Sequence, residues 1–574
     1  MATDDTTNEN PHPSSSSAVL QNQELLTNIF RHYLPWDPRS LQKSELREGR
    51  MRLRDLALTC KAFKDPALNC LWTFMDSLIP LVKILPNLHI LDNTYYFHGT
   101  LPNDSAFRQY APKIRILDLR PPPASQPNPP QEPIAISAQL LVYLMRELEG
   151  HLIFPGLKKV EIRHFASSGG LDVFSVLPLM CSSSVHSVAL LGNAFSSPLF
   201  RNCCLPAMSH RLGSLKYLLI KFTNRNAASN LCDPILRLTT LENLQLEFSK
   251  AEGIPPNMIL RLARTLTKLT TLVLDIHFSN HHVSDESFRL GETELGLSLN
   301  LNSVVVTSRL PDRVCPCIPQ FLLARTTKFI WKLPNRTTIT DPASFAPVIE
   351  SLSKMTTLQF IKVHTNDGGS MNVATVLPFL LQLSLQGLTI ELPILSAGPP
   401  LRPLIEAAFT GRLSDSRPAT LKRLNLAHAV QVADGVRLND GITLECISQV
   451  SQNAIGLEHL SAALRPSFTS STPGGVSLQD WVTALRGVPR STCTLQTMVI
   501  CDGRDASIGT PFEEASSIAQ ILDLLFPRLV SIKPYQDDTS QVYWTQRWAY
   551  IENLRLSYKA ARTAANRPGL AVEP

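Results

Sequence analysis

The residue types that carry most enzyme chemistry occur in this 574-residue chain singly or in adjacent pairs, and the familiar catalytic spacings are absent. The sequence has no Gly-x-Gly-x-x-Gly or Gly-x-x-x-x-Gly-Lys-Ser/Thr loop to cradle a phosphate, no Gly-x-Ser-x-Gly elbow and no His-Glu-x-x-His zinc motif. His281 and His282 lie beside Ser and Asn residues, which is typical of a solvated surface loop. The close cysteine pairs, Cys203-Cys204 and Cys315-Pro316-Cys317, lack partners at zinc-ligand spacing. The sequence therefore predicts a non-catalytic protein without a metal site or a cofactor.

Four charged side chains remain as candidates for a weak substrate-binding surface. Lys159, Glu161 and Arg163 alternate with apolar residues, and Arg423 occupies a similar position farther along the chain. Such alternation places polar side chains on one face of a β-strand and apolar side chains on the other. We expect these four residues to line the open face of a sheet, where charged groups are also often simply solvated.

These residues lie within a pattern, Leu-x-x-Leu-x-Leu, which we call a beat. Leu241–Leu246 and Leu269–Leu274 are clear examples. Clear beats begin at residues 157, 185, 215, 241, 269, 301, 358, 385, 421, 457 and 495, and weaker ones at 114, 326 and 529. From 157 to 326 successive beats lie 25 to 32 residues apart, and later intervals are 27 to 38 residues. Leucine-rich repeats are about 20–29 residues long, so the later repeats carry insertions.

The stretch before each beat is helical in pattern, as in Pro255–Leu266, where Met258, Leu262 and Leu266 have helical spacing. Units of helix, turn and strand joined in series give a parallel sheet with helices on one side. The sequence therefore predicts an α/β fold, a solenoid of irregular leucine-rich repeats. Leu244 and Leu246 should point inward, with the polar residues between them on the concave face. The asparagine that usually follows such a beat is absent, so no asparagine ladder is expected.

Composition sets the broad class of the protein. A net charge of +6 over 574 residues is too dilute to indicate a nucleic-acid partner. The polar, acidic N-terminus does not resemble a signal peptide. The most apolar stretch, Val376–Ile394, is interrupted by polar residues and should not span a membrane. We expect an intracellular protein, cytoplasmic and/or nuclear, with reduced cysteines.

The N-terminal region lacks the repeat pattern and is predicted to form helices instead. Residues 1–18 are polar and are expected to be disordered. A first helix over Glu24–Phe30 carries Leu25, Leu26 and Ile29 on one face, and a loop is expected over residues 35–50. A second helix covers Leu53–Phe63, with Leu56 on its apolar side. A third is expected to begin at Asp65-Pro66, to include Trp72 and to run on through Leu85.

This segment resembles an F-box. The family pattern is Leu-Pro-x-Glu-Leu-Leu-x-x-Ile-Phe, then Leu-x-x-Leu-Ala-x-Thr/Val-Cys-Lys/Arg-x-Phe/Trp, then Leu-Trp. The matching parts here are Leu20–Phe30, Leu53–Phe63 and Leu71-Trp72, with Gln21 in place of the proline. An F-box followed by leucine-rich repeats is similar to a fungal-type family of F-box substrate receptors.

The resemblance implies the substrate-recognition subunit of a Skp–cullin–F-box ubiquitin ligase. The F-box would dock on the Skp adaptor and through it reach a cullin-RING ligase, while the repeats would bind a protein substrate of unknown identity. The residues that match adaptor-docking or helix-holding positions of the family are Leu25, Leu26, Ile29, Leu53, Leu56 and Trp72. Sequence alone does not separate these two roles.

The expected domains are a disordered N-terminus over residues 1–18, an F-box-like module over 19–80, a solenoid over 81–535 and a capping helix with a tail over 536–574. Two alternatives stay open. The protein could be a non-degradative scaffold whose helical module packs on the first repeats and exposes no apolar face. It could also be an enzyme with a site in the insertions after residue 385, although no cluster of polar residues indicates one there.

Overall fold

In a computed structural model, the chain divides into two compact units, one of residues 1–254 and 264–269 and the other of residues 255–263 and 270–574. Apart from short gaps, the described residues are 20–35, 41–119, 135–163, 181–192, 200–222, 232–248, 261–276, 301–307, 326–333, 338–339, 350–365, 370–371, 377–391, 421–426, 432–437, 442–465, 477–488, 491–502, 512–534 and 542–565. The disorder predicted for residues 1–18, His281-His282 and the Cys315/Cys317 pair lie outside these residues.

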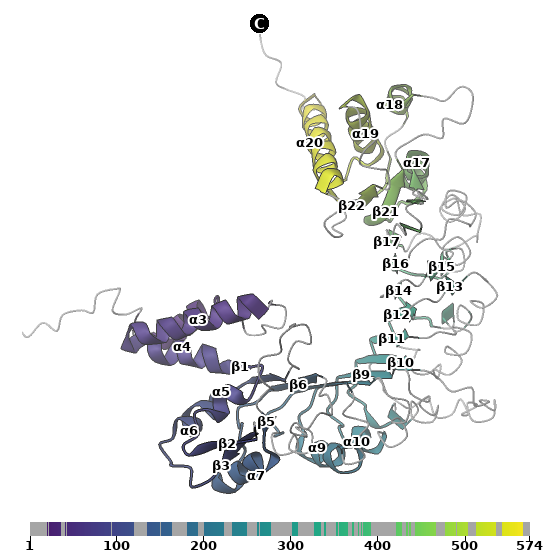
Figure 1. Cartoon of the computed structure of the whole chain (residues 1–574). Coiled ribbons are helices and arrows are strands. Elements are labelled where there is room, and N and C mark those ends of the chain that lie inside the picture. Colours follow the sequence, from purple (N-terminus) through teal and green to yellow (C-terminus); the bar gives the residue numbers. More distant parts are fainter. Residues whose placement is uncertain are drawn as a thin grey trace, which may run out of the picture. The chain divides into compact units, whose positions relative to one another are not determined.

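The first unit begins with three helices, α2 (Gln23–Phe30), α3 (Lys43–Thr59) and α4 (Lys61–Thr73). Figure 1 labels α3 and α4, in purple. The Asn22 side chain caps α2 by accepting a 2.9 Å hydrogen bond from the Leu25 N–H. The three helices enclose a core of Leu26, Phe30, Leu34, Leu46, Leu53, Ala67, Cys70 and Phe74, together with Ile116 from the following sheet. We call these helices, residues 22–73, the helical module.

The predicted loop over residues 35–50 is wrong in its second half, because α3 begins at Lys43. The charged run favours a helix because Lys, Glu, Arg, Met and Leu are good helix formers. It also carries the spaced apolar residues Leu46 and Leu53, which are 5% and 0% exposed. Glu48 and Arg52 form an ion pair one helical turn apart on the outer side. The charges that suggested a loop are thus the solvent-facing side of a helix.

The third helix also differs from the prediction at both ends. It begins at Lys61, after an extended Cys60, so the predicted helix over Leu53–Phe63 is divided between α3 and α4. Pro66 lies inside α4, where it removes the hydrogen bond to Ala62 near the start of the helix. The helix ends at Thr73 because Phe74 is extended and pairs with the sheet, so the predicted continuation through Leu85 is wrong.

A parallel sheet follows in the first unit, and it starts at Phe74, inside the stretch 19–80 that was predicted as the F-box-like module. Its strands pair in the order β1, β4, β6, β7, β8 and β9. Their bounds are Phe74–Met75, Ile116–Leu119, Lys159–Arg163, Ser187–Leu191, Tyr217–Phe222 and Asn243–Phe248. The intervening helices and turns are α5 (Ile79–Val82), α6 (Ala106–Tyr110), η2 (Ala111–Lys113), α7 (Ala138–Glu147), η4 (Phe200–Cys204), α9 (Leu205–Arg211) and α10 (Cys232–Leu236). A small sheet of β2 (Leu88–Leu91), β3 (Thr94–Phe97) and β5 (Ala135–Ile136) was not anticipated.

The second unit carries a longer parallel sheet, in the order β10, β11, β12, β14, β16, β17, β21, β22 and β23. Its bounds are Thr271–Ile276, Ser303–Thr307, Lys328–Leu333, Phe360–Thr365, Gly387–Glu391, Arg423–Leu426, His459–Arg465, Thr497–Asp502 and Ser531–Pro534. The described helices are α17 (Leu444–Asn453), α18 (Leu478–Arg486), α19 (Phe512–Leu525) and α20 (Val542–Ala565). Short pairs β13 (Thr338–Ile339) with β15 (Ser370–Met371) and β18 (Val432–Ala433) with β19 (Val436–Arg437) lie beside it, and β20 (Ile442–Thr443) pairs with β21.

The beats predict these strands closely, since every beat has a strand that begins two residues after its first position. Neighbouring strands pair without a shift, so that Leu218 lies opposite Leu244 and Ile220 opposite Leu246. Leu244 and Leu246 are fully buried, as predicted, while Gln245 between them lies on the open face. A mixed α/β fold with long runs of parallel strands, one per repeat, fits a leucine-rich-repeat solenoid.

Hydroxyl side chains link successive repeats where the asparagine ladder is missing. Ser184, Thr240 and Thr494 each stand just before the first residue of a beat, and we call them the hydroxyl ladder. Each hydroxyl lies within hydrogen-bond distance of two carbonyl oxygens of the preceding repeat, which share its single O–H donor. The acceptors are Pro155 and Leu157 (3.2 and 2.9 Å), Gly213 and Leu215 (3.1 and 2.9 Å), and Ile455 and Leu457 (2.9 and 3.3 Å), respectively.

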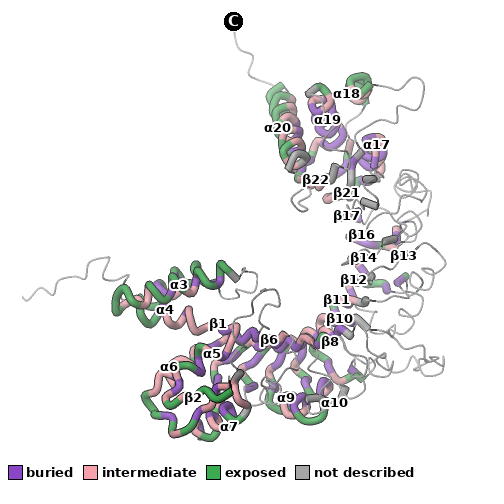
Figure 2. The backbone as a smooth tube through the Cα atoms, in the orientation of Figure 1, coloured by how far each residue is buried: buried purple, intermediate pink, exposed green. Residues whose placement is uncertain are grey.

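The helix α20 covers the last strand of the second unit. Its Arg555 is 0% exposed and donates hydrogen bonds to the carbonyls of Leu529 (3.1 Å) and Val530 (3.3 Å), just before β23. The Tyr558 hydroxyl lies 2.8 Å from Ser516 Oγ of α19. Figure 2 shows α19 largely buried and α20 exposed along its outer side. This is the packing expected of a cap on a repeat array.

Candidate functional site

Two apolar stripes run along α2, one buried and one exposed. Leu26 and Phe30 are each 3% exposed and form part of the core of the helical module. Leu25 and Ile29, one residue earlier in each turn, are 40% and 42% exposed. Tyr33 continues the exposed stripe just after the helix, with the Arg52 guanidinium 5.8 Å from its ring centroid. We call Leu25, Ile29 and Tyr33 the outer stripe.

The structure shows which of the six residues that match the F-box pattern are buried in the core and which are exposed. Leu26 and Leu53 are core residues, and Leu56 is partly buried against the same core. Trp72 is half-buried and stacks on Tyr110, with ring centroids 4.9 Å apart and an interplanar angle of 11°. Trp72 therefore holds α4 to α6. Leu25 and Ile29 are the two predicted adaptor residues that present a large exposed side chain.

The helical module also packs on the first strands of the sheet. Ile116 of β4 lies in the module's core. The Arg115 N–H donates to the Thr73 carbonyl at 3.0 Å, and the Lys113 ammonium donates to the Asn69 side chain. The module and the first repeats are therefore one packed body, with the outer stripe on its surface.

Charged side chains form ion pairs on the open face of the first unit's sheet. Arg163 pairs with Glu161 at 2.8 Å and lies 3.5 Å from Asp118 on the neighbouring strand β4. Asp118 is 0% and Glu161 5% exposed, whereas the Arg163 side chain is 38% exposed. Farther along, Lys221 pairs with Glu247 at 2.6 Å. The structure thus brings Glu161 and Arg163 together, with Lys159 at the start of the same strand.

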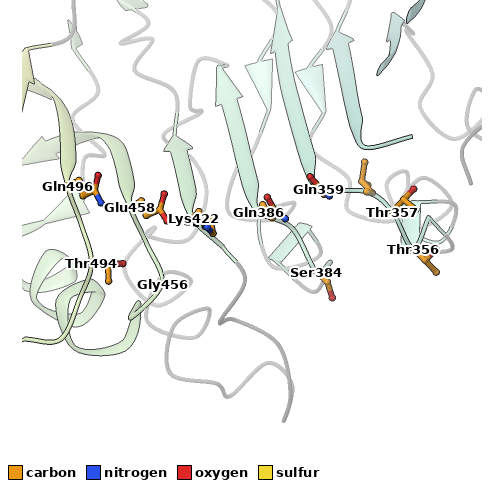
Figure 3. Close-up of a pocket in the computed structure, with 11 residues that line it drawn as sticks. Thr356, Thr357, Gln359, Ser384, Gln386, Lys422, Gly456, Glu458, Thr494 and Gln496 are labelled. Carbon is orange, nitrogen blue, oxygen red and sulfur yellow. Dashed lines mark ion pairs between the residues drawn. The ribbon is translucent and has the colours of Figure 1, made fainter. Parts of the chain in front are cut away.

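The second unit holds a polar groove that the sequence analysis missed. It has a volume of about 680 Å³ and is lined by residues at the starts of successive strands (Figure 3). The second residues of five beats form its row of side chains, namely Gln359, Gln386, Lys422, Glu458 and Gln496. Lys422 and Glu458 form an ion pair at 3.3 Å. The beat itself was the available signal, because residues at one beat position must form a row across a parallel sheet in register.

Arg423 is the first residue of strand β17 in the second unit, directly after Lys422. Lys159, Glu161 and Arg163 belong to strand β6 in the first unit. It lies beside Gly387, where a Cβ atom would come within 2.6 Å of the Phe360 ring. The four predicted binding residues therefore belong to two surfaces. Amide and charged groups on both can hydrogen-bond to polar segments of another protein.

Seven cysteines whose side chains the structure describes are free thiols, namely Cys60, Cys70, Cys181, Cys203, Cys204, Cys446 and Cys493. Burial raises the pKa of Cys181 to about 12, and it also raises the pKa values of Cys70 and Cys493. Among the residues that the structure describes, no group of three or more His, Cys, Asp and Glu could hold a metal ion. No helix in the described part of the chain is long and apolar enough to cross a bilayer.

No protein-family model matches the chain, and no curated protein matches its sequence. Similar solved structures include the leucine-rich repeat-containing protein LegL7 from Legionella pneumophila, with 10% identity and a TM-score of 0.32 over 69% of this chain and 97% of LegL7. Another is a chain from the Toll–Spatzle complex of Drosophila, with 14% identity and a TM-score of 0.25 over 66% of this chain and 51% of that chain. At such low scores, the fold assignment depends on the repeats and strand register of this chain itself.

Proposed function

We propose that this protein is a non-catalytic substrate receptor of a Skp–cullin–F-box ubiquitin ligase. In this proposal the helical module docks on the Skp adaptor, and the open faces of the repeats bind a protein substrate. Holding substrate lysines near a charged conjugating enzyme raises their effective concentration, and this needs no catalytic group on the receptor itself.

The observation that carries the proposal is the outer stripe. Leu25 and Ile29 match the F-box pattern, yet they contribute less to the core of the module than Leu26 and Phe30 do. Apolar side chains that are exposed in line on a short helix are suited to a partner's apolar groove. Burying the exposed part of each would contribute about 1 kcal/mol, from about 1.5–3 kcal/mol for a whole aliphatic side chain.

The repeats supply surfaces suited to a second protein. The polar groove of the second unit spans five beats and offers amide donors and acceptors beside the Lys422–Glu458 pair. The ion pairs of Glu161, Arg163, Lys221 and Glu247 give the first unit's face a mixed charge. Such surfaces favour a polar protein segment over a nucleic acid, which would need a predominantly basic face.

The test is co-purification of the full chain with the Skp adaptor from cells. The double substitution Leu25→Asp and Ile29→Asp places two carboxylates on the outer stripe, and each should cost several kcal/mol if the stripe is desolvated on docking. We expect the adaptor to be lost while the melting temperature stays close to that of the wild type. Val142→Asp is the matched control, because Val142 lies on α7 and is 56% exposed. Retention of the adaptor by the double variant would contradict the proposal.

A second candidate is a scaffold whose helical module caps the repeats. The packing of Ile116 in the module's core and of Trp72 on Tyr110 favours it. The exposed outer stripe argues against the scaffold, because a helical module that only caps the repeats was expected to expose no apolar face. In the same experiment, a well-folded wild-type chain that never brings down the adaptor would favour the scaffold.

A further inference from the structure

The small sheet of the first unit has an open edge at β2 (Leu88–Leu91). Because β3 lies between β2 and β5, β2 has a partner strand on one side and no described strand on the other. Three of its four residues are exposed (Figure 2), and Ile90 and Leu91 are 57% and 63% exposed. We call the outer side of this strand the β2 edge. An apolar edge strand is a template for pairing with another chain.

The pairing of β2 with β3 shows which backbone groups face the β2 edge. Leu91 and Thr94 enclose the turn between the two strands, so they form a hydrogen-bonded pair, and bonded and non-bonded pairs alternate from there. His89 therefore also bonds to β3. The N–H and C=O groups of Leu88 and Ile90 point outward, toward the β2 edge.

Tyr95 of β3 supports this direction and also defines an apolar layer. It lies opposite Ile90, and its carbonyl accepts a 3.1 Å hydrogen bond from the Ser137 N–H, on the β5 side. Opposite residues share a face of the sheet, so Ile90 lies beside Tyr95, which is 2% exposed. On the same face Phe97 packs edge-on against Tyr143 of α7, with ring centroids 6.1 Å apart. This layer ends at the exposed Ile90.

We infer that the β2 edge binds an extended segment of another protein, which adds to the small sheet as an antiparallel strand. The main chain of that segment would pair with Leu88 and Ile90, and such main-chain bonds supply affinity in strand addition. Its residue opposite Ile90 should be apolar, because that residue extends the buried layer. Antiparallel pairing is slightly the more stable arrangement. The inference goes beyond the proposed function, because it involves neither the helical module nor the open faces of the repeats.

Two other occupants fit the β2 edge less well. A second copy of the chain would pair four residues with four, which buries far less than the about 1,200 Å² of a stable specific interface. The stretch 121–133, which precedes β5 in the chain, contains seven prolines, and proline has no N–H to donate to a strand. A transient contact with a partner's extended segment needs no such area.

The test uses the full chain and the peptide Lys-Thr-Val-Thr-Val-Thr-Lys, with hydrogen exchange read at single residues. We expect the peptide to slow the exchange of the Leu88 and Ile90 amides and to leave those of His89 and Leu91 unchanged, because the latter already bond to β3. Absence of protection at a peptide concentration of about 1 mM would overturn the inference.

Modified peptides test the register without changing the protein, with affinity measured by fluorescence anisotropy. N-methylation of the valines removes the N–H groups that would pair with the β2 edge and should weaken binding about tenfold or more. N-methylation of the threonines should have a much smaller effect, because their N–H groups point away from β2 in this register. Equal affinities of the three peptides would overturn the inference.

A substitution in the strand tests the same contact from the protein side. Ile90→Lys removes the apolar contact and should weaken peptide binding about fivefold or more. Val142→Lys is the matched control, because Val142 lies on α7 and is 56% exposed, and it should leave the affinity unchanged. Thermal melting establishes that both variants are folded. Dimerisation of the free chain that Ile90→Lys abolishes would overturn the inference, because it would assign the β2 edge to a second copy.

Discussion

Thr240 offers a direct test of how the repeats are held together. Its hydroxyl lies 3.1 Å from the Gly213 carbonyl oxygen and 2.9 Å from that of Leu215, in the preceding repeat. Thr240→Val keeps the branched shape and removes the hydroxyl. One hydrogen bond contributes about 0.5–1.5 kcal/mol net, and a half-buried acceptor that loses its donor adds to this. We therefore expect the substitution to lower the free energy of unfolding by about 1–2 kcal/mol.

The neighbouring residue provides the control. Thr239 is exposed and one position outside the hydroxyl ladder, so Thr239→Val should change stability by less than about 0.5 kcal/mol. Urea unfolding of the full chain gives the global change, and hydrogen exchange of the β8 and β9 amides shows where it occurs. If Thr240→Val and Thr239→Val are equally stable and exchange alike, the hydroxyl ladder does not stabilise the stacking of repeats.

Two further predictions concern the cap on the second unit. Arg555→Met should lower the free energy of unfolding by about 3–5 kcal/mol, measured by chemical denaturation, because Glu552 and two backbone carbonyls lose a buried partner. The control Leu556→Met, on the exposed side of α20, should have little effect. Arg562→Gln removes a 2.9 Å hydrogen bond to Asp523, whose pKa burial raises and Arg562 holds down. Burial disfavours the charged form of Asp523 in the folded protein, so this group makes the protein less stable as the pH rises through its pKa. Arg562→Gln raises the pKa of Asp523 further, so the destabilisation caused by the substitution should shrink from pH 7 toward pH 4. A destabilisation independent of pH would refute this coupling.

The sequence predicted the sheet well because each beat encodes one buried strand. Leucines two residues apart, such as Leu244 and Leu246, report which side faces the core, and parallel pairing in register follows from stacking equal units. The strand β1 was missed because Phe74-Met75 is too short to show a period. The start of α3 was missed because its charged residues resemble a loop unless the buried Leu46 and Leu53 are counted together.

The candidate surfaces were harder to predict because they depend on contacts between distant segments. Leu26 and Ile29 are both apolar residues of one helix, and only packing against α3 and α4 makes Leu26 core and leaves Ile29 exposed. Trp72 matched a family position, but its stacking on Tyr110 required knowing where α6 lies.

The central claim is that the helical module is a docking site for the Skp adaptor. The most direct measurement is a titration of the purified full chain with purified Skp adaptor, with binding measured by isothermal titration calorimetry. The account predicts a saturable one-to-one complex with a Kd of about 1 μM or tighter, equivalent to about −8 kcal/mol. Absence of binding at adaptor concentrations of about 100 μM, with a chain that melts cooperatively, would contradict it.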